Sequence, residues 1–139
     1  MAVRLVVALA VALPLAAADL ALKVARPTPA WAWHERSPSW LVLCAVVLAA
    51  LALVLRLPSQ VVPPAAGVLA GGILGNGLSA AWYGLEVPNP IVLTGDRAVV
   101  AFNLADVFVL VGLVALFVAL SVWLVSNRRL LPEPRWRRR

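Results

Sequence analysis

Residues 102–125, FNLADVFVLVGLVALFVALSVWLV, form a run in which Asp106 is the only charged residue. The next charge along the chain is Arg128. A helix needs ~20 mostly apolar residues to cross the ~30 Å hydrocarbon core of a bilayer, and this run exceeds that length. The run therefore predicts a membrane-spanning helix that carries an asparagine and an aspartate, Asn103 and Asp106, at its beginning.

Three further runs have a similar length and composition: residues 5–22, 40–57 and 61–81. The chain of 139 residues is 63% hydrophobic and 13% charged, with a mean hydropathy of +0.96, which excludes an ordinary soluble domain. The runs are continuous rather than alternating, so they favour helices over the strands of a membrane barrel. The sequence predicts an all-α membrane protein, a single domain of four transmembrane helices over residues 1–139 with a basic tail at 126–139.

Two local patterns add detail to this bundle. The third run carries Gly67, Gly71 and Gly75 at four-residue spacing, a pattern that lets a second helix approach closely. The loop that follows is rich in proline and β-branched residues, which indicates an extended segment along the membrane surface.

The basic residues predict how the helices are oriented in the membrane. With four crossings, both termini share one side with the loop between the second and third helices. That side carries eight of the 12 basic residues, and the positive-inside rule places it in the cytoplasm. Arginines that follow a membrane helix favour anionic lipid over nucleic acid as their partner. The eight are Arg4, Arg56, Arg128, Arg129, Arg135, Arg137, Arg138 and Arg139.

The first run has a second interpretation, a secretory signal peptide. Arg4 precedes an apolar region that ends in the small residues of PLAAAD. Against this interpretation, Asp19 and Lys23 lie one helical turn apart in the same segment. Its removal would also leave three helices and place the two termini on opposite sides of the membrane. We therefore expect the segment to be retained as the first membrane helix.

Polar residues of the predicted helices gather at one end of the bundle, on the outer side of the membrane. Asp19 and Lys23 end the first helix there, and Asn76 lies near the end of the third. Asn103 and Asp106 begin the fourth. Polar and charged groups are costly near hydrocarbon and generally face an interior or a water-filled cavity. Two interpretations stay open: a functional site, or structural roles in which Asp106 caps its helix and Asp19 pairs with Lys23.

Two motifs connect these polar residues to a family. GGILGN, which ends at Asn76, and FNLAD, which ends at Asp106, occur in this order in a four-span chain that resembles the bacterial lipoprotein signal peptidases, or signal peptidase II. Members of that family are four-helix membrane aspartic peptidases, in which two aspartates activate the water that cleaves a diacylglyceryl-modified prolipoprotein. The resemblance implies that Asp106 is one catalytic aspartate and that Asn76 and Asn103 support the site and contact substrate. Asp19 and Lys23 match the aspartate and lysine that end the family's first helix.

The chain departs from that family at the first catalytic aspartate. The matching stretch is GLEVPNP, so Asn89 takes the position of the aspartate. An asparagine cannot share a proton or act as a base. Asp96 and Glu86 lie in the same loop and are candidate substitute carboxylates. The family's GNxxDR motif is also altered, because Ser79 and Ala80 replace its Asp-Arg pair.

The predicted function is a lipoprotein signal peptidase-like role in the bacterial cytoplasmic membrane. If active, the protein removes signal peptides from diacylglyceryl-modified prolipoproteins. If the missing aspartate makes it degenerate, the alternative is a non-catalytic protein that binds lipidated peptide or lipid at the same outer cleft. A third interpretation is a small transporter or channel with Asp19, Lys23 and Asp106 as an ion relay, but the membrane helices carry few charges for such a relay.

The partners that follow from this prediction are membrane lipid and a prolipoprotein or lipidated peptide, with no nucleic acid. We expect no cofactor. We also expect no metal, since His34 has no second histidine or cysteine near it in the sequence.

Overall fold

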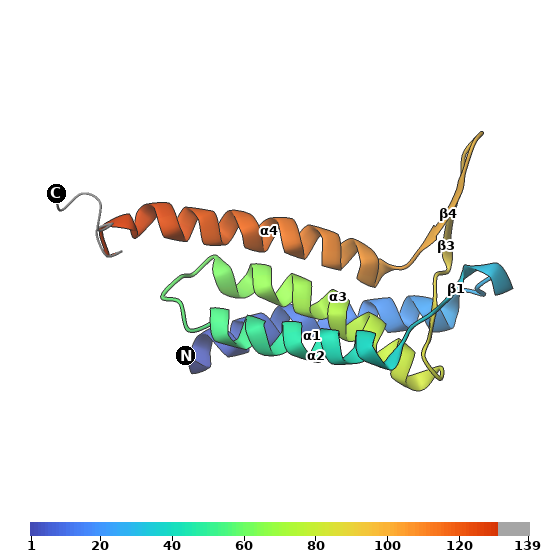
Figure 1. The fold of residues 1–139 in the computed structure, drawn as a ribbon, viewed down its shortest axis with the longest axis horizontal. Coiled ribbons are helices and arrows are strands. Elements are labelled where there is room, and N and C mark those ends of the chain that lie inside the picture. Colours follow the sequence, from blue (N-terminus) through green and yellow to red (C-terminus); the bar gives the residue numbers. More distant parts are fainter. Residues whose placement is uncertain (131–139) are drawn as a thin grey trace.

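The computed structural model describes residues 1–130 of the chain, which are mostly helical. Four helices lie roughly side by side and alternate in direction, so the N-terminus and the end of the last helix share one end of the bundle (Figure 1). At the opposite end, which we call the strand end, the chain forms short strands and the 3₁₀ helix η1 (Ala30–Ala32). The four helices are α1 (Ala2–Ala25), α2 (Pro38–Val54), α3 (Val62–Trp82) and α4 (Leu104–Ser126).

Three helices, α1, α3 and α4, are long and apolar enough to cross a membrane, and α2 is a shorter apolar helix of 17 residues. The Ser37 hydroxyl starts α2 by accepting a hydrogen bond of 3.2 Å from the backbone N–H of Trp40. α2 ends at Val54 rather than at the expected residue 57, and a turn at Leu55 and Arg56 leads the chain to Pro58, before which a helical conformation is disfavoured. The second predicted span is therefore present as a helix and is shorter than predicted.

The predicted basic tail is described only at its beginning. After α4 ends at Ser126, one 3₁₀ turn, η2 (Arg128–Leu130), follows. Residues 131–139, which include the other four arginines of the tail, lie outside the described residues.

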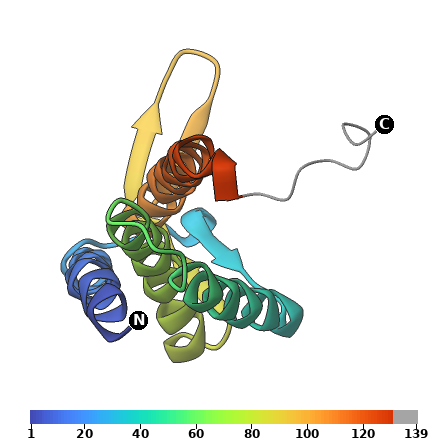
Figure 2. The ribbon, with the colours of Figure 1, turned by 90° about the vertical axis from the view of Figure 1, so that its left-hand side faces the viewer.

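α3 is the central helix of the bundle and packs against both α1 and α4 (Figure 2). The glycine spacing on this helix predicts such close packing, and the structure confirms it. A Cβ atom at Gly67 would lie 2.6 Å from the Ala8 carbonyl oxygen of α1, and Gly71 faces α1 in the same way. The neighbouring Gly72 faces α4, where a Cβ atom would lie 2.5 Å from the Ala105 carbonyl oxygen.

The packing of α1 bears on the signal-peptide interpretation of this segment. Ala8, Ala12 and Ala16 are buried on one side of α1, and Ala8 and Ala12 lie directly against the glycines of α3. Loss of α1 would expose this small-residue face of α3 and would remove Asp19 and Lys23, which are both buried. The structure therefore favours α1 as an integral helix of the fold.

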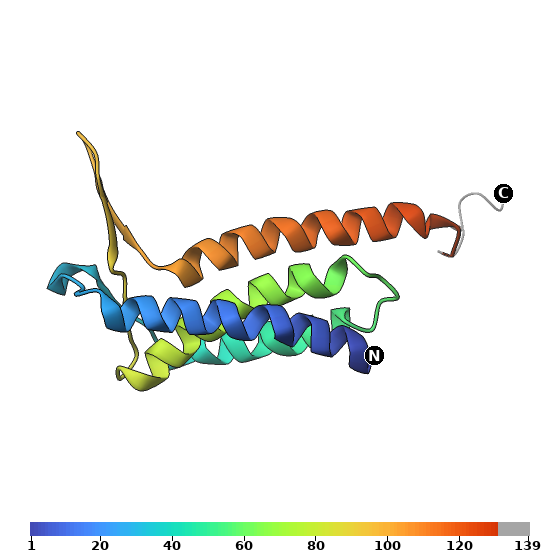
Figure 3. The same ribbon diagram turned by 180° about the vertical axis from the view of Figure 1, so that it is seen from behind.

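The strand end contains two separate antiparallel strand pairs. β1 (Trp33–Glu35) pairs with β2 (Glu86–Pro88), with His34 opposite Val87. This pairing brings the segment after α1 beside the segment after α3. β3 (Ile91–Thr94) and β4 (Val99–Phe102) form a hairpin that projects away from the helices just before α4 (Figures 1 and 3). The extended segment predicted from sequence is thus largely made of short strands.

A tight turn after α3 directs the chain into β2. Gly84 and Leu85 both adopt positive φ, at 66° and 76°, a region that is strained for leucine. Hydrogen bonds hold this backbone in place. The Leu85 N–H donates to the Ala80 carbonyl at 2.7 Å, and the Leu85 carbonyl accepts from the Arg36 N–H at 2.7 Å. The turn thereby leads the chain toward Asn89, which follows β2.

Candidate active site

A buried ion pair joins three helices at the strand end. The Lys23 Nζ lies 2.7 Å from the Asp19 Oδ2, and both side chains are at most 1% exposed. Lys23 also donates to the Asn76 Oδ1 at 2.9 Å and to the Ser79 Oγ at 3.0 Å, so all three ammonium hydrogens have partners. Asp19 uses its other oxygen to accept a hydrogen bond of 2.8 Å from the backbone N–H of Ala105, at the start of α4.

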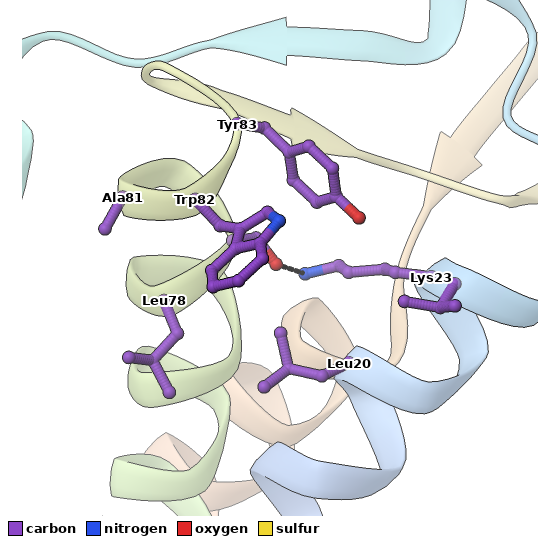
Figure 4. Close-up of a pocket in the computed structure, with 8 residues that line it drawn as sticks. Leu20, Lys23, Leu78, Ala81, Trp82 and Tyr83 are labelled. Carbon is purple, nitrogen blue, oxygen red and sulfur yellow. Dashed lines mark hydrogen bonds between the residues drawn. The ribbon is translucent and has the colours of Figure 1, made fainter.

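The lysine side chain crosses the gap between α1 and α3. Figure 4 shows Lys23 extending from α1 toward α3, where Trp82 and Tyr83 lie beside it. These residues line a cavity of about 420 Å³ with mostly apolar walls. Because Lys23 is already paired and hydrogen-bonded, its charge stabilises the arrangement of the helices at this end of the bundle.

Asp106 takes part in a capping box at the start of α4. The Asn103 Oδ1 accepts a hydrogen bond of 3.0 Å from the Asp106 N–H, and the Asp106 Oδ2 accepts one of 3.2 Å from the Asn103 N–H. The Asp106 Oδ1 accepts a third, of 2.9 Å, from the Asn76 Nδ2. Asp106 is half-buried, so both carboxylate oxygens are held in place while the group keeps some access to solvent. The structural role and the placement in a polar site, which sequence left as alternatives, are both present.

Asn89 is 1% exposed and lies next to Asn103. Its backbone N–H donates to the Ala32 carbonyl at 3.1 Å. Its side-chain oxygen accepts a hydrogen bond from the Asn103 Nδ2, and its Nδ2 lies 3.0 Å from the His34 Nδ1. The hydrogen-bonded contact between Asn89 and Asp106 is therefore indirect and passes through Asn103.

The structure brings together six of the eight site residues expected from sequence: Asp19, Lys23, Asn76, Asn89, Asn103 and Asp106. It places the other two elsewhere. Asp96 is exposed in the turn of the β3–β4 hairpin, far from the start of α4 (Figure 1). Glu86 is exposed at the first position of β2, opposite Glu35. Within residues 1–130, neither carboxylate is hydrogen-bonded to the polar network.

Sequence reasoning missed the position of His34 in this network. Histidine was considered only as a metal ligand, and no group of three His, Cys, Asp or Glu side chains suited to a metal occurs in the part of the chain described here. The contact of His34 with Asn89 spans 55 positions in the sequence and depends on the pairing of β1 with β2. A one-residue register shift would turn the histidine to the other face of the strands, so no spacing rule could have revealed it.

A groove leads from the apolar part of the bundle to these polar residues. It has a volume of about 270 Å³ and lies between α2, α3 and α4. Its walls are almost entirely apolar, including Trp40, Leu69 and Val109, and Asn76 is its one polar lining residue. Asn76 also donates to Asp106, so a single side chain connects the groove with the carboxylate.

With this geometry in view, the comparisons with known proteins assign the family. The family model described as signal peptidase (SPase) II matches residues 11–122. The chain belongs to the signal peptidase II family. That family comprises aspartic-type peptidases of lipoprotein processing, and the apolar helices identify this member as a multi-pass membrane protein.

A solved structure shares the fold of this signal peptidase II family member. It is a bacterial membrane enzyme determined by the in meso method at 2.3 Å resolution, with a TM-score of 0.66 and 16% sequence identity. The alignment covers 91% of this chain and 92% of the other. No curated protein matches the chain.

Proposed function

We propose that this signal peptidase II family member binds diacylglyceryl-modified prolipoprotein peptides at the strand end, and that its cleavage activity is weak because Asn89 replaces one of two aspartates. The observation that carries this proposal is the arrangement around Asn103. That residue hydrogen-bonds to Asp106 on one side and to Asn89 on the other. Asn103 thus lies between one carboxylate, Asp106, and one amide, Asn89, at positions where the family pattern implies two carboxylates.

The expected weakness follows from the chemistry of a carboxylate pair. Two carboxylates close together cannot both ionise, so one acts as a base on water while the protonated one polarises the substrate carbonyl. Asp106 alone can still serve as a base. The Asn89 amide has no proton to exchange at any relevant pH, so the second role is unfilled at that position. General acid–base assistance of this kind contributes on the order of 10²–10⁴-fold to a rate.

The groove between α2, α3 and α4 supports a lipidated ligand. Its apolar walls suit acyl chains or the apolar part of a signal peptide. Asn76 lines the groove and donates to the Asp106 Oδ1, so a ligand in the groove would be separated from the carboxylate by a single side chain.

The proposal includes four membrane crossings with both termini in the cytoplasm of a bacterium, and the strand end on the outer side of the inner membrane. The alternating direction of the helices and the shared end of the N-terminus and α4 support it. The basic residues Arg4, Arg56, Arg128 and Arg129 all lie at that shared end.

The alternative is a protein that binds lipidated peptide or lipid and does not cleave. The replacement of the aspartate by Asn89 favours it. Binding and cleavage measured on the same purified protein distinguish the two, because a pure binding protein holds the peptide and leaves it intact.

The test uses a fluorescent lipobox peptide with a diacylglyceryl-modified cysteine, and the same peptide without the lipid as control. We expect the wild type to bind the lipidated peptide selectively and to cleave it weakly or not at all. Asn89→Asp is nearly isosteric and should raise cleavage, on the order of a hundredfold. A further Asp106→Asn should abolish this gain.

Two results would contradict the proposal. If the wild type cleaves well and loses this activity on Asp96→Asn or Glu86→Gln, another carboxylate does the work. If neither the wild type nor Asn89→Asp binds or cleaves the lipidated peptide, the groove serves a different ligand.

A further inference from the structure

The hydrogen bonds from α4 to β1 have a fixed direction. They start at the Asp106 backbone N–H, which can only donate, and it donates to the Asn103 Oδ1 at 3.0 Å. The Nδ2 of the same amide must then point the other way. It does so toward two acceptors, the Pro88 carbonyl at 3.4 Å and the Asn89 Oδ1. The orientation of the Asn103 amide is thus fixed at both ends by backbone groups.

The orientation of the Asn89 amide in turn determines the protonation of His34. Because the Asn89 Oδ1 accepts from Asn103, the Asn89 Nδ2 faces His34 as a donor, 3.0 Å from its Nδ1. An imidazole nitrogen that accepts a hydrogen bond carries no proton, so the ring is neutral and its proton is on Nε2. We call this series of hydrogen bonds, from the Asp106 N–H through Asn103 and Asn89 to His34, the amide chain.

We propose that neutral His34 is a positioning residue of the active site: its unprotonated Nδ1 ends the amide chain and holds the Asn89 amide in the orientation in which it accepts a hydrogen bond from Asn103, the residue that caps Asp106. This inference rests on the proposed function for its catalytic consequence, while the protonation state of the ring is a separate property of the molecule. His34 acts through the two asparagines rather than by contact with Asp106.

Protonation of the ring would oppose this arrangement. A proton on the His34 Nδ1 would face the N–H groups of Asn89. If the Asn89 amide rotated to turn its oxygen toward this proton, its N–H groups would face those of Asn103. Reversing Asn103 as well would set its Nδ2 against the Asp106 N–H, which cannot change direction. The amide chain is therefore complete with a neutral ring, at higher pH, and is broken when the ring gains a proton as the pH falls.

The surroundings of His34 give water access to this switch. The imidazole is exposed, whereas Asn89 and Asn103 are buried. The charged groups near it are Glu35 and Arg36 on its own segment, Glu86 on the paired strand β2, and Asp106 at the far end of the amide chain. Because the imidazole is exposed, a proton from solvent can reach the ring directly.

The identity of residue 89 determines which form of the ring is favoured. The asparagine presents a donor to His34. A carboxylate at this position only accepts, so it would hydrogen-bond to a proton on the His34 Nδ1 instead. Asn89→Asp should therefore give an imidazole that is protonated on Nδ1, either by moving the proton from Nε2 or by adding a second proton to the ring. The protonation of His34 thus depends on the side chain at position 89.

The decisive experiment is nitrogen NMR of the imidazole in the full chain, in detergent or nanodiscs. The sequence contains one histidine, so the labelled ring gives one assignable pair of nitrogen signals. We expect the wild type at high pH to have its proton on Nε2, and the near-isosteric Asn89→Asp to have Nδ1 protonated. A wild-type ring protonated on Nδ1, or signals that do not change in Asn89→Asp, would overturn the inference.

A second experiment measures peptide binding and cleavage by variants of His34. His34→Asn keeps an acceptor oxygen near the position of Nδ1 and has no charge to gain, whereas His34→Leu removes the acceptor. We expect His34→Leu to reduce peptide binding or cleavage by about five- to tenfold, in line with the net contribution of one hydrogen bond. His34→Asn should recover most of this and should lack the loss that the wild type shows on acidification.

Equal losses in His34→Asn and His34→Leu would contradict the inference. If the wild type shows no binding or cleavage at any pH, the proposed function fails. The NMR result would then still decide whether His34 ends the amide chain.

Discussion

Asp106 combines two roles that usually belong to different residues. As the N3 residue of a capping box it accepts the Asn103 N–H, and as the carboxylate of the site it accepts the Asn76 Nδ2. A carboxylate suits both partners, because each of its oxygens accepts. The two donors meet different oxygens of Asp106, so an amide at this position would turn its NH2 group toward one of them and lose that hydrogen bond.

We therefore expect Asp106→Asn to keep the fold and lose function. The free energy of unfolding should fall by about 1 kcal/mol, the net contribution of one hydrogen bond, while cleavage or lipidated-peptide binding is lost. Thermal unfolding in detergent and the peptide assay measure the two effects. Asp96→Asn, in the exposed turn of the hairpin, is the matched control and should change neither. Retained function in Asp106→Asn would falsify the site assignment.

Lys23 and Asp19 provide a prediction about stability. Lys23→Met leaves the buried Asp19 carboxylate without its cation, and breaking a buried ion pair in this way costs about 3–5 kcal/mol. Adding Asp19→Asn removes the unpaired charge and keeps an acceptor for the Ala105 N–H, so the double variant should unfold at a higher temperature than Lys23→Met alone. If the two substitutions are additive, the pair does not act as a coupled unit.

At the scale of single residues, the sequence predicted which motif residues lie together, and it did not predict the positions of the residues between the helices. Asn76, Asn103 and Asp106 lie together as expected, because each occupies the end of a helix that its apolar run already predicts. The substitute carboxylates and His34 lie in the segments between the helices, Glu86 and His34 in short strands and Asp96 in a hairpin turn. Their positions depend on a turn at Gly84 and Leu85 and on strand pairing, which local patterns do not reveal.

Among the elements, α3 is the one that tolerates least change. Its glycines face two different neighbours, since Gly67 and Gly71 meet α1 while Gly72 meets α4. Sequence spacing predicted a single close-packed face. The second face was not predicted, because Gly72 is adjacent to Gly71 and the turn of the helix brings it to α4.

Gly72→Ala should separate α3 from α4. A Cβ atom there would lie 2.5 Å from a backbone oxygen and 2.7 Å from the Val109 backbone nitrogen, and backbone cannot move aside as a side-chain end can. We expect a loss of about 1–3 kcal/mol in the free energy of unfolding.

Gly77→Ala on the same helix is the control for this prediction, since nothing lies within 4 Å of the added atom. Its stability should be unchanged or slightly raised, because alanine has the higher helix propensity. Equal effects of the two substitutions would show that contact with α4 is not the cause.

For the molecule as a whole, the length of α2 determines how the chain crosses the membrane. α2 has 17 residues and rises ~25 Å, at the lower limit for a crossing, while the other three helices are longer. A four-helix orientation requires α2 to cross. If α2 does not cross, the two ends of the chain lie on opposite sides.

Cysteine labelling in a Cys44→Ala background tests this orientation in intact cells. Trp31→Cys and Leu93→Cys are exposed at the strand end and should react with a membrane-impermeant reagent from outside. Gln60→Cys, exposed in the loop between α2 and α3, should react only after the membrane is opened. Outside labelling at position 60 would contradict four crossings with cytoplasmic termini.

The hydrogen bond between the Asp19 carboxylate and the Ala105 N–H joins residues 86 positions apart. A ribosome completes α1 long before it reaches α4, so this bond is among the last to form during synthesis. Until then Lys23 neutralises Asp19 within a single helix, which lets α1 enter the membrane with its charge already balanced. Asp106 is synthesised with the last helix, after Asn76 of α3, which donates a hydrogen bond to its carboxylate. A nascent or truncated chain that lacks α4 therefore lacks Asp106 and carries no complete polar site.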